Sequence, residues 1–80
     1  MPFTVVWSQA ALARLAAIWT RSANRNAVTA AQYQIDLLLR VDPDTRGVPF
    51  FGDRLLVVLP LRVIFSINVM DMMVHVHDVW

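Results

Sequence analysis

The chain has 80 residues, of which 58% are hydrophobic and 16% are charged, and its formal net charge is only +1. This length accommodates one domain, residues 1–80, and such a short chain buries only about 60% of the surface that its unfolded form exposes. The absence of cysteine excludes disulfide bridges, thiolate zinc sites and cysteine nucleophiles. A mean hydropathy of +0.52 is high for a small domain, so we expect some apolar surface that another chain covers.

The sequence pattern predicts neither a membrane anchor nor a secretion signal. The longest apolar stretch, residues 55–67, is shorter than a membrane span and is interrupted by Pro60 and Arg62. At the N-terminus there is no basic segment followed by an apolar run and a small-residue cleavage site. We therefore expect a cytoplasmic protein that has no membrane partner.

The first residues alternate in polarity like a strand and then change to the spacing of a helix. Phe3, Val5 and Trp7 fit one face of a strand over residues 3–7, and Ser8 fits a helix N-cap. The helix expected over residues 9–22 has one apolar stripe, formed by Leu12, Leu15, Ile18 or Trp19, and Ala23.

A second helix is expected after the polar link at residues 24–26. Its core-facing stripe has the spacing 3, 4, 3 and consists of Val28, Ala31, Ile35 and Leu38. Asp36 and Arg40 are spaced as a favourable i,i+4 ion pair on this helix. Two helices joined by so short a link are expected to form an antiparallel hairpin.

The second half of the chain changes to the period of strands. Proline, glycine and aspartate over residues 41–49 predict a loop or a bent edge segment, and strands are expected over residues 55–59, 61–69 and 72–79. The order β-α-α-β-β-β predicts the α+β class, in which the helix pair covers one face of an antiparallel sheet. The opposite face of this sheet is left open.

Arg62 is the most unusual residue of the expected sheet, because it lies inside an apolar strand. A period of two places it with Ile64 and Ser66 on the open face, and Arg54 on the preceding strand is expected nearby. Two arginines there would form an anion site that fits a phosphate. The alternative is that Arg62 only pairs with a carboxylate and fixes the strand register, the candidates being Asp53, Asp71 and Asp78.

His75 and His77 are two residues apart on the last strand and therefore share a face. A metal site normally needs a third or fourth ligand, and only Asp78 or a distant aspartate is available, so we expect neither a metal nor a cofactor. An imidazole titrates near neutrality, and a histidine close to arginines could act as general acid or base in phosphodiester cleavage. Solvated or partner-facing histidines are the alternative.

The chain resembles the RelE/ParE superfamily of toxins from type II toxin–antitoxin modules. The likeness covers nearly the whole chain and rests on the order and spacing of five features: residues 7–12, residues 38–43, Gly47, residues 61–67 and residues 74–79. Arg62 matches the central-strand arginine of that superfamily, and Arg54 falls near a basic position of the preceding strand.

This resemblance implies a cytoplasmic toxin that a cognate antitoxin wraps and neutralises in a hetero-oligomer. RelE-like members cleave mRNA at the ribosome with residues on the open sheet face, whereas ParE-like members inhibit DNA gyrase and are not nucleases. For a ribonuclease, the candidate catalytic residues are Arg62, Arg54, His75 and His77. The alternatives are a gyrase inhibitor and a degenerate toxin retained as an antitoxin-binding module.

Overall fold

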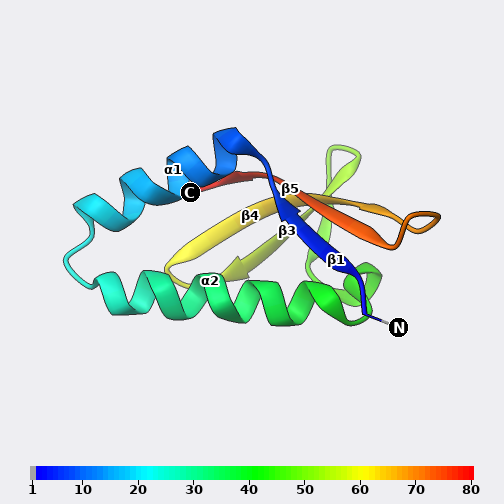
Figure 1. Cartoon of the computed structure of the whole chain (residues 1–80), viewed down its shortest axis with the longest axis horizontal. Helices are drawn as coiled ribbons and strands as arrows, with labels where there is room; N and C mark the ends of the chain where they lie inside the picture. The colour runs from blue at the N-terminus through cyan, green and yellow to red at the C-terminus, as the bar shows by residue number, and fades with distance from the viewer. Residues whose placement is uncertain (1) are drawn as a thin grey trace.

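The computed structural model describes residues 2–80, in which two helices cover one face of a five-stranded sheet (Figure 1). In chain order the elements are β1 (Thr4–Trp7), α1 (Gln9–Arg21), α2 (Arg25–Arg40), the short 3-10 helix η1 (Pro43–Thr45), β2 (Val48–Phe50), β3 (Asp53–Val58), β4 (Leu61–Asn68) and β5 (Met73–Val79). The strand order across the sheet is β1-β5-β4-β3-β2. Strand β1 runs parallel to β5, and the other neighbouring strands are antiparallel. Neither α1 nor α2 is long and apolar enough to cross a membrane.

The expected α+β class and helical layer are confirmed, but the expected element order lacked β2. This strand lies at the edge of the sheet and contains Pro49, which is why its sequence resembles a loop. Proline is tolerated in an edge strand because the missing N–H removes no bond from the interior of the ladder. The segment before β2 is fixed by Gly47, whose φ is +67° and whose backbone passes close to Leu55.

The hydrophobic core lies between the helices and the sheet, and β4 shows how it is formed. Leu61, Val63 and Phe65 of this strand are fully buried, as the period of two predicted. The helices and neighbouring strands supply the rest of the buried core, namely Ala11, Leu15, Val28, Ala31, Ile35, Leu39, Leu56, Val74, Val76 and Val79.

The expected stripes of the two helices are correct in part. On α1 the buried residues are Ala11 and Leu15, whereas Leu12 is 47% exposed, so its expected place in the core is wrong. On α2 the fully buried leucine is Leu39, and Leu38 is only partly buried. A single amphipathic pattern leaves the orientation of a helix uncertain by about one residue, because adjacent positions are only about 100° apart.

Polar side chains at the helix ends fix where the helices begin and how they join the sheet. Asn24 caps α2 by accepting a hydrogen bond from the backbone of Ala27. Trp7 donates from its indole nitrogen to Asp36 at 2.8 Å and thereby ties β1 to α2. No ion pair between Asp36 and Arg40 occurs in residues 2–80, so that expectation is wrong.

Gly47 and Gly52 provide a matched test of how closely the backbone before β2 approaches Leu55. Both have positive φ, but an added Cβ at Gly47 would collide with the carbonyl of Leu55, whereas at Gly52 it would meet nothing within 4 Å. We expect Gly52→Ala to lower the free energy of unfolding by about 1 kcal/mol from backbone strain alone. Gly47→Ala should cost about 3 kcal/mol or more, since strain and collision add. Urea denaturation of both variants measures this, and equal losses would contradict it.

Candidate functional site

The face of the sheet opposite the helices carries a group of polar side chains that we call the open face. Arg62, Ile64 and Ser66 alternate with the buried residues of β4 and therefore point away from the helices. This expectation from the sequence is confirmed by the burial pattern. On the neighbouring strand β5, His75 lies directly opposite Ser66.

A β-bulge in β5 changes which residues at the end of this strand lie outside the core. Ile64 pairs with Asp78 while Phe65 pairs with Val76, so His77 is an extra residue without a partner in the register. As a result two consecutive residues of β5, His77 and Asp78, lie off the core, and Val79 returns to it. Bulges often occur beside functional sites, where they redirect a side chain.

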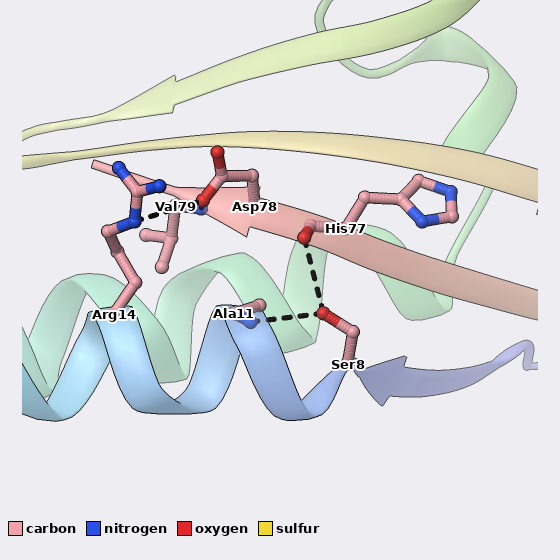
Figure 2. A network of polar contacts seen from close by, with 6 residues as sticks. All are labelled: Ser8, Ala11, Arg14, His77, Asp78 and Val79. Carbon is pink, nitrogen blue, oxygen red and sulfur yellow. Dashed lines mark hydrogen bonds and ion pairs between the residues drawn. The ribbon is translucent and has the colours of Figure 1, made fainter.

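Helix α1 is attached to β5 at this bulge through Ser8 (Figure 2). The Ser8 hydroxyl accepts a hydrogen bond from the backbone N–H of Ala11 at 3.0 Å and donates to the carbonyl oxygen of His77 at 3.2 Å. One turn further along α1, Arg14 forms an ion pair with Asp78 at 3.4 Å. Figure 2 shows the imidazole of His77 extending away from Ser8 and α1 while its carbonyl is held. The bulge is therefore fixed from the helical side through the backbone of His77, and the imidazole makes no contact with Ser8 or Arg14.

The imidazole of His77 has one polar partner, the hydroxyl of Ser66. The Ser66 Oγ to His77 Nε2 distance is 2.7 Å, a short hydrogen bond between adjacent strands. The ring of His75 lies nearly parallel to that of His77, with 6.5 Å between their centroids and 17° between their planes. The site therefore holds two imidazoles side by side with a hydroxyl hydrogen-bonded to one of them.

The residues around the two rings bear on which ligand they could bind. A metal site normally needs a third or fourth protein ligand. No group of three or more His, Asp or Glu residues in the part of the chain that the structure describes could hold a metal. Two imidazoles on an open face can instead donate hydrogen bonds to an anion such as a phosphoryl group.

The two arginines expected to form an anion site lie on opposite faces of the sheet, so their expected proximity is wrong. Arg54 pairs with the buried Phe65, whereas Arg62 pairs with the exposed Val57. The guanidinium of Arg54 donates to the carbonyl oxygens of Arg46 at 2.9 Å and Gly47 at 3.1 Å. Arg54 therefore holds the loop before β2 in place and has no position on the open face.

The Arg62 side chain forms neither a hydrogen bond nor an ion pair within residues 2–80. Of the three candidate carboxylates, Asp78 pairs with Arg14 and Asp71 accepts from Asn68, and Asp53 forms no ion pair with Arg62. The hypothesis that Arg62 only fixes strand register through an aspartate is therefore wrong. Its guanidinium keeps its donors available for a ligand.

A second surface feature lies in the helical layer, away from the open face. An apolar groove of about 480 Å³ runs between α1 and α2, with Leu15 and Val28 among the residues that line it. Leu12 and Trp19 on α1 also line the groove and are 47% and 43% exposed. This groove accounts for part of the apolar surface that the composition predicted.

No protein-family model and no curated protein sequence matches this chain. Two solved structures are similar over nearly its whole length. A chain of the toxin–antitoxin complex RelBE2 from Mycobacterium tuberculosis is 20% identical, with a TM-score of 0.78 over 99% of this chain and 96% of that chain. A chain of the chromosomal ParDE toxin–antitoxin system from P. aeruginosa is 19% identical, with a TM-score of 0.76 over 96% and 92%. The chain has the RelE/ParE fold.

Within this RelE/ParE fold, sequence reasoning placed Arg62 on the open face and His75 and His77 on one shared face, but missed what holds them. The contact of Ser66 with His77 and the ion pair between Arg14 and Asp78 were not predicted. One signal was present, because β5 alternates apolar and polar residues up to His77 and then adds a second polar residue. Such a break in alternation is typical of a bulge.

Replacing Ser66 by alanine tests whether the Ser66 hydrogen bond sets the state of the His77 ring. In wild type we expect His75 and His77 to differ in the ratio of their two neutral tautomers, because only His77 has a fixed partner. Ser66→Ala should bring the ratio of His77 to that of His75, as read from ring nitrogen chemical shifts in NMR. Ser22→Ala, in the loop between the helices, is the control. An unchanged His77 in Ser66→Ala would contradict the hydrogen bond.

Proposed function

We propose that this chain is the toxin of a type II toxin–antitoxin module and cleaves mRNA at the ribosome. The fold supports the toxin part of this proposal, because the two structures described above come from toxin–antitoxin systems. The observation that carries the choice of reaction is the pair of parallel imidazoles 6.5 Å apart, one of them hydrogen-bonded to a hydroxyl. Two imidazoles on one face can supply a general base and a general acid to the same phosphodiester, which supports this choice.

The reaction that fits these groups is an internal transphosphorylation of RNA. One imidazole accepts the proton of the ribose 2′-hydroxyl, whose oxygen then forms a bond to the adjacent phosphorus. The bond from phosphorus to the 5′-oxygen breaks, and the second imidazole donates a proton to that leaving oxygen. The Ser66 hydroxyl lies 2.7 Å from Nε2 of His77. It contacts the imidazole as the attacking 2′-hydroxyl would in this reaction.

The positive charge on the open face comes from Arg62, which lies on the same face as the imidazoles and can attract the RNA backbone. A guanidinium forms charge-assisted hydrogen bonds to phosphate oxygens, which are stronger than those between neutral groups. Arg54, the second arginine that the resemblance implied, has no part in the proposal because its donors are directed to loop carbonyls on the other face.

Substituting the histidines one at a time tests the cleavage reaction. His75→Gln and His77→Gln should each reduce cleavage of a ribosome-bound transcript by about 10²–10⁴-fold, the usual contribution of a general acid or base. Cleavage is measured by primer extension on purified ribosomes with the purified chain added. Gln34→Ala, an exposed change on α2, is the control and should cleave like wild type.

Two other outcomes would replace this proposal with one of its alternatives. Undiminished cleavage in both histidine variants would remove the imidazoles from the mechanism. If wild type cuts no transcript but blocks supercoiling by purified DNA gyrase, the chain is a ParE-like inhibitor. If it does neither and its expression leaves growth unchanged, it is a degenerate toxin kept for antitoxin binding.

The proposed antitoxin has a suitable docking site in the groove between α1 and α2. An amphipathic helix commonly binds by placing its apolar face in such a groove. Leu12 and Trp19 leave about half of their surface exposed there, which is costly in water and favours a partner that covers them. The floor is rigid because Leu15 and Val28 belong to the buried core.

A charge in the groove should weaken the complex without unfolding the toxin. Leu12→Asp places a carboxylate on the groove wall, and we expect antitoxin affinity to fall about 100-fold, as for the loss of a central interface contact. Tyr33→Asp, on the exposed side of α2 and outside the groove, is the control. Isothermal titration with the antitoxin encoded beside the toxin measures both, and equal effects would contradict the groove.

A further inference from the structure

Arg62 differs from most arginines of this chain in having no acceptor. Five of the seven form a hydrogen bond or ion pair through the guanidinium, namely Arg14, Arg21, Arg25, Arg46 and Arg54. Within residues 2–80, only Arg40 and Arg62 do not, and only Arg62 of these two lies on the sheet. A guanidinium has five N–H donors in a fixed plane, which suits a phosphate group.

The position of Arg62 along β4 separates it from the histidine pair. Arg62 and Ser66 are four residues apart, and at about 3.3 Å per residue their Cα atoms are about 13 Å apart. Ser66 contacts His77 and lies opposite His75, so the space between the two rings is at the Ser66 end. A phosphate placed there is therefore well removed from the backbone of Arg62. The long arginine side chain spans part of this distance, so its guanidinium can meet a neighbouring phosphate of a strand that follows a basic groove.

We propose that Arg62 binds the phosphate next along the RNA strand and not the phosphate held between His75 and His77. This inference rests on the proposed function, and it makes Arg62 a positioning residue that aligns an extended single strand with β4. Two or more nucleotides would then lie along the strand, and Arg62 would act through binding, with the imidazoles acting on the reacting phosphate.

An RNA strand can pass between these two positions because Arg14 offsets the negative charge of the nearby Asp78. Asp78 pairs with Ile64, halfway between Arg62 and Ser66, and a free carboxylate there would repel a polyanion. Arg14 forms an ion pair with Asp78 at 3.4 Å and offsets this charge. Ile64, the side chain of β4 between the two binding positions, is uncharged and only partly exposed. No other acidic residue belongs to this stretch of β4 and its β5 partners.

The experiment compares two non-cleavable probes that differ by one phosphate. A 2′-O-methyl dinucleotide has one bridging phosphate and a 2′-O-methyl trinucleotide has two. Binding to the full chain is followed by NMR on the ring resonances of His75 and His77. The second phosphate should tighten binding to wild type about tenfold or more, as for a charge-assisted hydrogen bond. Arg62→Gln should lose this gain and bind the dinucleotide like wild type.

Arg40→Gln is the matched control, since Arg40 also lacks an acceptor within residues 2–80 but lies at the end of α2. It should keep the full gain from the second phosphate. The proposal is overturned if Arg62→Gln weakens the dinucleotide as much as the trinucleotide, which would place Arg62 on the same phosphate as the histidines. It is also overturned if Arg62→Gln changes neither affinity, or if wild type binds neither probe.

Failure of the proposed function gives a different pattern. If the chain cuts no ribosome-bound transcript and the trinucleotide still gains through Arg62, the enzymatic proposal fails while the strand-binding role of Arg62 stands. If cleavage depends on both histidines but the probe affinities do not depend on Arg62, the enzymatic proposal stands and the strand-binding role of Arg62 fails. A well-dispersed spectrum of Arg62→Gln that matches wild type away from β4 shows that the variant is folded.

Discussion

One extra residue in β5, held by the first turn of α1, determines which residues at the end of this strand stay outside the core. Without the bulge, strict alternation after Val74 and Val76 would bury Asp78 and expose Val79, and a buried unpaired carboxylate is very costly. With the bulge, Val79 stays in the core and Asp78 lies outside it, next to His77. Ser8 stabilises this local departure from the ladder because one hydroxyl both caps α1 and donates to the carbonyl of His77. Sheet, helix and candidate site therefore meet at one hydrogen-bonded junction.

Much of the fold could be predicted because the strands and helices have clear and different periods. The alternation in β4 was sufficient to separate Leu61, Val63 and Phe65 from the residues of the open face. The helix order and the open face follow from that pattern together with the length of each segment. Strand β2 was missed because three residues that include Pro49 carry almost no periodic signal, and only the pairing with β3 makes them a strand.

The candidate site was less predictable, because residue types give faces but not register. Arg54 and Arg62 were expected to be neighbours since both lie on adjacent strands, but the hairpin register pairs Arg62 with Val57 and puts Arg54 on the other face. A one-residue change of register reverses the face of every side chain in a strand, and the continuous apolar run of β3 leaves the choice to the turn geometry. The contact of Ser66 with His77 depends in addition on the bulge. Both features are set by backbone geometry that a single sequence does not specify.

The groove and the open face lie on different sides of the molecule. A partner that binds in the groove therefore does not automatically cover the open face. The groove is formed by α1 and α2, whereas His75 and His77 lie on the far side of the sheet. A segment that filled only the groove would leave the imidazoles and Arg62 accessible to a phosphodiester. Under the proposed function, complete neutralisation would therefore require an antitoxin long enough to pass the edge of the sheet, or one that displaces α1. Because α1 forms one wall of the groove and also carries Arg14 and follows Ser8, a shift of this helix would disturb the support of His77 directly.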